Sequence, residues 1–206
     1  MVRLILIRHG QTACNITDIW HGWDDCRLTE LGVAQAEALA QRLAAEPMVA
    51  MYCSDLRRAV ETAGIVAGPH GLTPVTDPAF RERKAGDFQG LSTEEVVRQR
   101  PSVWDERASD FWNWTPPNGE SFTQLLERVM AGVDRIREAH PDDTVALVGH
   151  MGTVRVLTSK LLGIPMAKTY EMDFPSTGVT ILRLDGDAVT VEVLNDAAHL
   201  TVGAGG

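Results

Sequence analysis

The sequence has little cysteine and no cysteine pair at metal-ligand spacing. Its three cysteines, Cys14, Cys26 and Cys53, are odd in number and contain no C-x-x-C pair. Disulfide frameworks and cysteine zinc sites both depend on an ordered spacing of several cysteines. We therefore expect three reduced thiols, with neither a disulfide framework nor a zinc site.

Long apolar runs and an excess of positive charge are also missing. The first apolar run ends at Ile7 and is followed by Arg8 and His9, so it suits neither a signal peptide nor a membrane span. The formal net charge of −9 disfavours nucleic acid and anionic membranes as partners. We expect a cytoplasmic protein that can hold an anionic substrate only through a local cluster of basic residues.

The most prominent pattern in the sequence is a set of three apolar segments, each followed by a polar residue. Residues 2–7, 48–53 and 144–149 have the pattern of buried strands in a parallel sheet, and His9, Ser54 and His150 follow them. Open α/β sheets bind ligands at the carboxyl ends of their strands. With no linker or repeat in view, the chain is expected to form a single domain over residues 1–206.

Helix signals lie between and after these strands. Thr29 is expected to cap a helix that runs to about residue 43, and Ser54 a helix over residues 55–63. Capping boxes are expected at residues 92–95 and 121–124. Residues 179–184 and 189–194 are expected to pair as a hairpin at the edge of the sheet.

The polar residues near these strand ends suit phosphoryl transfer. A neutral imidazole such as His9 can carry a phosphoryl group, and arginine supplies donors to the phosphate oxygens. Glu82 is either a surface ion-pair partner or the acid that protonates a leaving oxygen. Only one of the neighbouring Arg57 and Arg58 can enter a shared pocket, and the helical pattern alone leaves open which one. His9 itself can equally be an ordinary solvated strand end.

The motifs, taken together, resemble the histidine phosphatase superfamily, which contains the cofactor-dependent phosphoglycerate mutases. They occur in the order of that family at residues 8–15, 22–32, 54–63, 81–90, 119–121 and 149–152. The resemblance implies a three-layer α/β/α sandwich with a mostly parallel central sheet. It also implies a small helical cap at about residues 91–121.

The resemblance also implies a role for each candidate residue. It makes His9 the phosphorylated nucleophile and Glu82 the proton donor to the leaving oxygen. It places the phosphate between Arg8, Arg58 and His150, and so selects Arg58 over Arg57. Further substrate or phosphate contacts are implied for Asn15, His21, Gly22 and Met151.

Three functions are left open, and a phosphomonoesterase acting on a small phosphorylated metabolite is preferred. The others are a phosphoglycerate mutase and a catalytically silent binding protein on the same fold. No metal or other cofactor is expected, and a homodimer is left open. The preference for a phosphatase depends on the cap, which has three cations against six anions and should repel a second anionic group. Arg83 and Lys84 argue the other way, because they flank the site and could hold such a group.

Four aromatic residues of the cap are expected to pack its small core. They are Trp104, Phe111, Trp112 and Trp114. If any of them faces the cleft, it would suit an apolar or uncharged leaving group.

Overall fold

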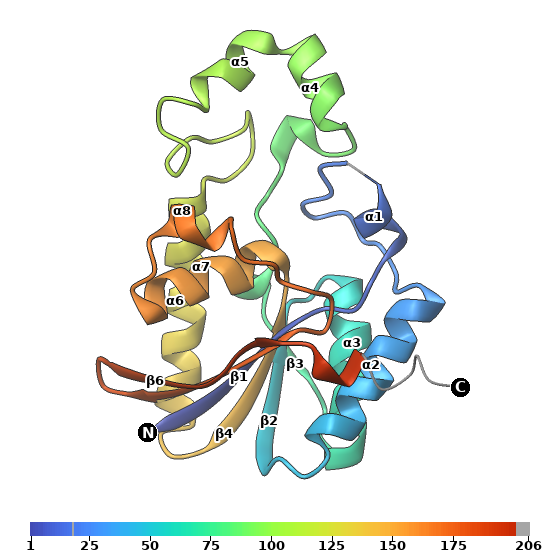
Figure 1. Cartoon of the computed structure of the whole chain (residues 1–206), viewed down its shortest axis with the longest axis vertical. Helices are drawn as coiled ribbons and strands as arrows, with labels where there is room; N and C mark the ends of the chain where they lie inside the picture. The colour runs from blue at the N-terminus through green and yellow to red at the C-terminus, as the bar shows by residue number, and fades with distance from the viewer. Residues whose placement is uncertain (18, 201–206) are drawn as a thin grey trace.

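A six-stranded mixed sheet forms the centre of the computed structural model, which describes residues 1–17 and 19–200 (Figure 1). Its order is β3-β2-β4-β1-β5-β6. The first four of these strands are parallel, and β5 and β6 form an antiparallel hairpin at one edge. The strands are β1 (Val2–Arg8), β2 (Met48–Cys53), β3 (Val75–Thr76), β4 (Thr144–Gly149), β5 (Val179–Asp185) and β6 (Ala188–Asp196).

Helices cover both faces of the sheet. Ile5 and Ile7 of β1 belong to a core with α2 (Glu30–Leu43) and α3 (Arg57–Ala67) on one side. Leu4 and Leu6 belong to a core with α6 (Phe122–Ala139) and α7 (Met151–Leu162) on the other. Alternate side chains of a strand point to opposite faces, so an uninterrupted apolar strand feeds both cores. The expected three-layer sandwich is confirmed.

The helix starts largely follow their capping residues. Thr29 caps α2 by accepting from the backbone N–H of Gly32, and the two expected capping boxes are present at Ser92 and Ser121. The start of α3 differs, because Ser54 accepts from the N–H of Leu56 and so stabilises a turn. The helix therefore begins three residues after Ser54.

The longest helix is amphipathic. α6 has 18 residues and buries one stripe against the sheet, including Leu125, Val129, Val133 and Ile136. This period of three to four residues is typical of a helix with one face in a core. Within the described part of the chain, no helix is both long and apolar enough to cross a bilayer.

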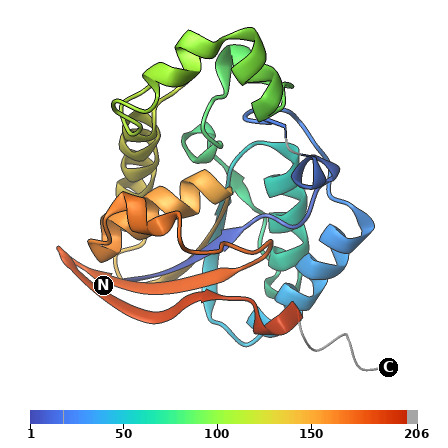
Figure 2. The same cartoon turned by 45° about the horizontal axis from the view of Figure 1, so that its top comes forward.

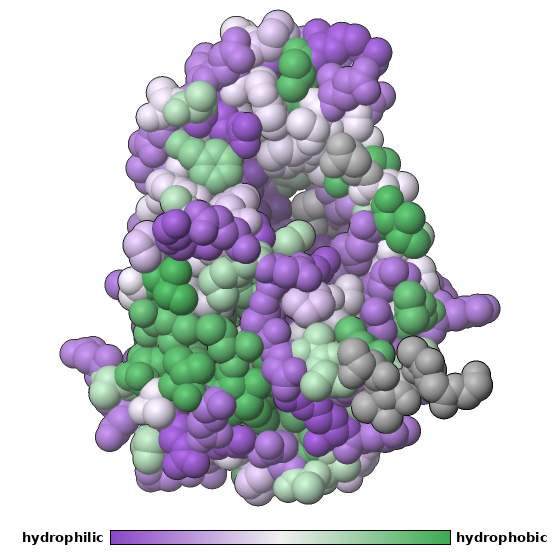
Figure 3. Space-filling model, in the orientation of Figure 1, coloured by the Kyte–Doolittle hydropathy of each residue, from purple (hydrophilic) through white to green (hydrophobic). Residues whose placement is uncertain are grey.

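A small cap lies above the carboxyl ends of the parallel strands, with α4 (Thr93–Gln99) and α5 (Pro101–Glu106) at its top (Figures 1 and 2). Trp114 packs there with Phe88 and Val96, and Trp104 packs against them. Phe111 and Trp112 instead pack against the main core near Phe122. The four cap aromatics thus serve packing, and Figure 3 shows the face hollowed between the cap and the body.

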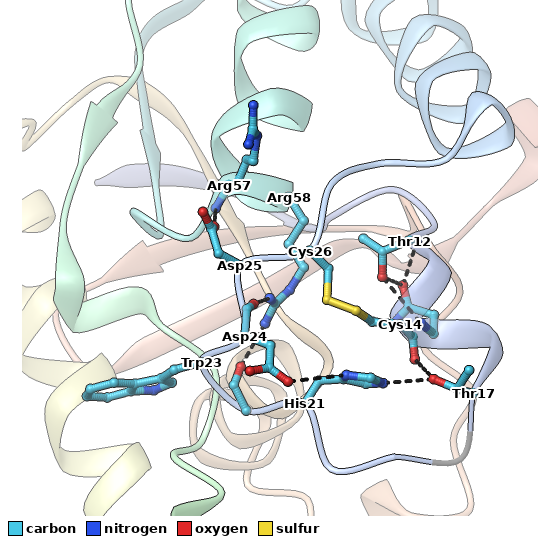
Figure 4. The surroundings of a disulfide bond; sticks show 12 residues. Thr12, Cys14, Thr17, His21, Trp23, Asp24, Asp25, Cys26, Arg57 and Arg58 are labelled. Carbon is cyan, nitrogen blue, oxygen red and sulfur yellow. Dashed lines mark hydrogen bonds and ion pairs between the residues drawn. A yellow bond between two sulfur atoms is a disulfide. The ribbon is translucent and has the colours of Figure 1, made fainter. Parts of the chain in front are cut away.

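The expectation of three reduced thiols is wrong for two of them. Cys14 and Cys26 form a disulfide, with their Cα atoms 6.4 Å apart (Figure 4). The chain turns back between them, and a bridge between Thr12 and Leu28 holds the two segments side by side. This pairing depends on the path of the loop and not on a spacing motif. Cys53 is a buried free thiol, as expected.

Short elements complete the chain. α1 (Ala13–Ile16) follows β1, and α8 (Met166–Thr169) follows α7. Single 3₁₀ turns occur at Gly68–His70, Pro78–Phe80, Gly86–Phe88 and Ala198–Leu200. The turns at residues 78–80 and 86–88 flank the segment that carries Glu82, which is therefore irregular backbone at the entrance to the site.

Candidate active site

The two candidate histidines meet where β1 and β4 end. These strands are parallel neighbours with Arg8 opposite Gly149, and the backbone N–H of His9 donates to the Gly149 carbonyl at 3.0 Å. The rings of His9 and His150 are consequently 5.2 Å apart between centroids. His9 and His150, which are 141 positions apart in sequence, thus meet at the carboxyl ends of two neighbouring strands, as the strand pattern predicts.

His9 is held as a neutral imidazole. Its Nδ1 lies 2.7 Å from the Gly10 carbonyl, and because a carbonyl only accepts, Nδ1 carries the proton and Nε2 keeps its lone pair. The side chain is only 3% exposed. Burial, together with the charges of Arg58 and Arg8, lowers the pKa of His9 well below its usual range. Nε2 is therefore free to act as a nucleophile at neutral pH.

His150 is oriented by Arg58. The Nε of Arg58 donates to Nδ1 of His150 at 3.1 Å, so the proton of a neutral His150 lies on Nε2. That Nε2 is buried and has no partner among the described residues. Burial, then Arg58 and His9, lower the pKa of His150 well below its usual range. The arrangement offers a neutral hydrogen-bond donor beside the nucleophile.

Arg58 itself is fixed by the loop that precedes α2. Its Nη1 donates to the Asp24 carbonyl at 2.6 Å and its Nη2 to the Gly22 carbonyl at 2.9 Å. Arg57 points away and pairs with Glu61 at 3.0 Å. Neighbouring positions on a helix differ by about 100° in direction, so only one of the two can reach the site.

A cavity of about 250 Å³ lies over His9. The Nε of Arg8, at its wall, is buried without a partner among the described residues, while its Nη1 donates to the Phe174 carbonyl. Every predicted site residue except His150, which is fully buried, lines this cavity: Arg8, His9, Asn15, His21, Gly22, Arg58, Glu82 and Met151. With Arg8 and Arg58 in its lining, the cavity suits a phosphate-sized anion.

Glu82 faces the same cavity from the segment between the turns at residues 78–80 and 86–88, and its carboxylate lies against the start of α7. Its Oε2 accepts from the backbone N–H of Gly152 at 2.9 Å, and its Oε1 accepts from the N–H of Arg83 at 2.6 Å. A Cβ atom at Gly152 would overlap Glu82 Oε1, so glycine is needed for this close approach. The carboxyl group is thus positioned by the backbone to exchange a proton with a substrate oxygen.

The two loop residues assigned to substrate binding are engaged with their own loop. Asn15 is exposed, and its Oδ1 accepts from the Thr12 N–H at 2.9 Å. His21 lies with Nε2 3.1 Å from Thr17 Oγ1 and Nδ1 3.7 Å from Asp24 Oδ2. Both residues nevertheless line the cavity over His9.

One group of possible metal ligands occurs in the described part of the chain. Ligand atoms of Cys14, His21 and Cys26 lie within 4.8 Å of one another. The two sulfur atoms are joined in the disulfide, which leaves no thiolate to bind a metal ion.

Arg128 is a positioning residue that the sequence did not single out. From α6 it donates to both carboxylate oxygens of Glu120, at 2.9 and 2.7 Å. It also donates to the carbonyls of Ala79, Arg81 and Glu82. The guanidinium of Arg128 therefore holds the segment that carries Glu82 in place. The motif at residues 119–121 pointed to Glu120, but its arginine partner is visible only in the fold.

Comparison with known proteins gives one consistent family. The model of the histidine phosphatase superfamily (branch 1) matches residues 4–197. Phosphoglycerate mutase-like protein 4 of Arabidopsis thaliana is 35% identical over 96% of this chain and 86% of its own length. Among solved structures, Bacillus stearothermophilus YhfR has a TM-score of 0.88 and 32% identity, over 97% of this chain and 100% of that one.

A phosphatase of stated substrate also matches. A mycobacterial glucosyl-3-phosphoglycerate phosphatase, solved with VO3, has a TM-score of 0.81 and 30% identity, over 94% of this chain and 98% of that one. The match of the family model to nearly the whole chain agrees with the paired histidines, the two arginines and the carboxylate at the strand ends. The chain belongs to the histidine phosphatase superfamily.

Proposed function

We propose that this protein is a metal-independent phosphomonoesterase that hydrolyses small phosphate esters through a phosphohistidine on His9. The observation that carries the proposal is the neutral imidazole of His9, which keeps Nε2 unprotonated and lines a cavity bordered by Arg8, Arg58 and Glu82. A nucleophile, an anion-binding wall and a proton donor are together what a two-step phosphoryl transfer requires.

The first step transfers the phosphoryl group to the enzyme. Nε2 of His9 attacks phosphorus, while Arg8, Arg58 and Nε2–H of His150 bind the phosphoryl oxygens and stabilise their charge. The bond between phosphorus and the ester oxygen breaks, and protonated Glu82 gives its proton to that oxygen. The products are a phosphohistidine and a free alcohol.

The second step regenerates His9. Glu82, now a carboxylate, takes a proton from a water molecule as that water attacks phosphorus. The bond between phosphorus and Nε2 breaks, inorganic phosphate leaves, and Glu82 is again protonated. Both steps use the same oxyanion donors, so one site serves the whole cycle.

A phosphoglycerate mutase is the second candidate. It is supported by the mutase-like relative and by Arg83, a buried cation in the cavity next to Glu82. A mutase must hold a bisphosphorylated intermediate while phosphate moves between two oxygens, which needs cations beyond those at the first phosphate. The negative charge of the cap does not distinguish a phosphatase from a mutase, because none of the cap carboxylates lines that cavity.

Rapid quench with ³²P-labelled substrate tests the covalent step. Wild-type protein should yield an acid-labile phosphoprotein, and His9→Ala should yield none and lose turnover while it keeps the wild-type melting temperature within a few degrees. Full labelling of His9→Ala, or substantial activity in it, would refute the role of His9.

Incubation with 3-phosphoglycerate and catalytic 2,3-bisphosphoglycerate, followed by ³¹P NMR, separates the two candidates. A phosphatase releases inorganic phosphate from simple monoesters and forms negligible 2-phosphoglycerate. Rapid isomerisation with little release of phosphate would establish the mutase instead.

A further inference from the structure

A second cavity of about 480 Å³ opens beside the first. The two share His21, Gly22, Glu82 and Met151 in their linings, so Glu82 stands between them. The space lies under the cap, at the hollow seen in Figure 3. When a phosphoryl group is at His9 and its ester oxygen is at Glu82, the leaving group has to extend into this second cavity.

Arg83 is a buried cation in its wall, and the carboxylates that act on it from nearby, Glu82 and Glu120, form no ion pair with its guanidinium. The residue is only 9% exposed, and its guanidinium has neither a hydrogen bond nor an ion pair among the described residues. It rests on ring faces instead, 4.2 Å from the centroid of Phe122 and 5.4 Å from that of Trp20. Cation–π contacts give only a fraction of what hydration of the charge would supply. An unpaired buried charge of this kind indicates a missing anionic partner.

Arg155 lies in the same wall on the other side of an aromatic pair. Its guanidinium carbon is 4.1 Å from the ring centroid of Tyr170, and the rings of Tyr170 and Phe122 are 6.0 Å apart. The Nε of Arg155 is buried without a partner, although Nη2 contacts the Met151 sulfur at 3.6 Å. Two arginines with unused donors thus flank Phe122 and Tyr170 in one cavity.

The charge of this cavity is opposite to that of its surroundings. Its charged lining residues are Arg83, Arg155 and Glu82, so two cations stand against one carboxylate. Thr93 is the cap residue in the lining, and four of the cap's acidic side chains, Glu94, Asp105, Glu106 and Asp110, are exposed to solvent. The positive cavity therefore lies in a protein with a net charge of −9.

We propose that Arg83 and Arg155 form an oxyanion subsite, which binds a carboxylate or a second phosphate on the leaving group of the substrate. The proposal rests on the proposed phosphatase function and narrows its substrate class to phosphate esters of anionic alcohols. The expectation of an apolar or uncharged leaving group depended on a cap aromatic facing the cleft. Among the described residues, the lining of this cavity contains none of the four cap aromatics, Trp104, Phe111, Trp112 and Trp114.

A matched series of esters tests the subsite. 3-Hydroxypropyl phosphate is neutral at its far end, 3-phosphooxypropanoate carries a carboxylate there, and propane-1,3-diyl bisphosphate carries a second phosphate. Wild-type protein should show kcat/KM at least about tenfold higher for an anionic ester than for the neutral one. The better of the two anionic esters identifies the preferred oxyanion.

Substitution of each arginine should remove that preference. Arg83→Met and Arg155→Met, which keep an unbranched apolar chain in the cavity, should each lower the ratio of anionic to neutral kcat/KM by about tenfold. The control Arg98→Met, an exposed cap arginine outside the cavity, should keep the wild-type ratio. Equal rates for the three esters in wild type, or an unchanged or uniformly lowered rate in both variants, would overturn the subsite.

A binding experiment separates this proposal from the phosphatase function. Calorimetric titration of His9→Ala with the same esters requires no turnover, and tighter binding of an anionic ester, lost in His9→Ala/Arg83→Met, supports the subsite. If wild-type protein hydrolyses none of the esters while this binding preference holds, the proposed activity fails and the subsite stands. Hydrolysis of all three without preference overturns the subsite alone.

Discussion

At the scale of single residues, the site depends on which atom of each side chain is left free. Nδ1 of His9 is occupied by the Gly10 carbonyl, and Nδ1 of His150 is occupied by Arg58. The two neutral rings therefore have opposite hydrogen-bonding roles: Nε2 of His9 has a free lone pair, and Nε2 of His150 has a free N–H. The same backbone contacts that orient Glu82 require glycine at position 152.

Glu82→Gln should slow esters with poor leaving groups far more than aryl esters. An alkyl oxygen needs a proton to leave, so its kcat should fall by roughly 10²–10⁴-fold, whereas p-nitrophenolate leaves without one. Steady-state kinetics with an alkyl phosphate and p-nitrophenyl phosphate measure the two effects.

Glu94→Gln, on the exposed surface of the cap, is the matched control for this experiment and should behave as wild type. Equal losses for the two classes of ester in Glu82→Gln would count against a proton-donor role for Glu82.

At the scale of structural elements, the loop between β1 and α2 joins the nucleophile to the phosphate-binding wall. It begins at His9 and supplies the Gly22 and Asp24 carbonyls that hold Arg58. The disulfide between Cys14 and Cys26 closes this loop across its middle (Figure 4). A cross-link over so short a span stabilises mainly by limiting the unfolded chain, and here it also limits the loop that positions Arg58.

Loss of the disulfide should lower stability and weaken substrate binding. Closing a loop of this size is worth about 3 kcal/mol, which corresponds to a fall in Tm of roughly 6–12 °C for a chain of this length. Cys26→Ser, or wild type in reductant, should show that fall, with KM raised more than kcat is lowered. Differential scanning calorimetry and steady-state kinetics measure the two effects.

The thiol count is a direct check on the same feature. Denatured wild-type protein should show one free thiol without reductant and three with it, because Cys53 is the free cysteine. Reductant should not shift the Tm of Cys14→Ser/Cys26→Ser. Three free thiols in protein purified without reductant would contradict the cross-link.

At the scale of the whole molecule, the fold concentrates positive charge where the chain as a whole is negative. The parallel strands β1 and β4 and the start of α3 deliver Arg8, His150 and Arg58 to one point under the cap. Arginine donors and the uncharged donor of His150 can supply the oxyanion stabilisation that a divalent cation supplies in other phosphoryl-transfer enzymes.

Activity should therefore survive removal of metal ions. Hydrolysis of p-nitrophenyl phosphate should keep its rate after dialysis against EDTA, since the charge at the phosphate comes from side chains. A protein mock-dialysed without EDTA is the control. Loss of activity that Mg²⁺ or Zn²⁺ then restores would contradict the expectation.

The local elements could be predicted from the sequence because their signals lie within short windows. The apolar runs of β1, β2 and β4 and the caps at Thr29, Ser92 and Ser121 depend on neighbours a few residues away. Parallel strands place their carboxyl ends together, so the meeting of His9 and His150 followed from the strand pattern. The residues of the family motifs then indicated the cavity that the structure shows.

Long-range packing alone decided the remaining features. The turn at Ser54 delays the start of α3 to Arg57. The path of the loop places Cys14 beside Cys26, and the packing of α6 places Arg128 against the Glu82 carbonyl. The sequence left Arg83 as a flanking cation, and only the fold shows it buried in one cavity with Arg155, with Nη1 lacking a hydrogen-bond partner among the described residues. Such pairings depend on where distant segments pack. The burial of a side chain and the partner of a charge are properties of the assembled core, so no short window of the sequence encodes them.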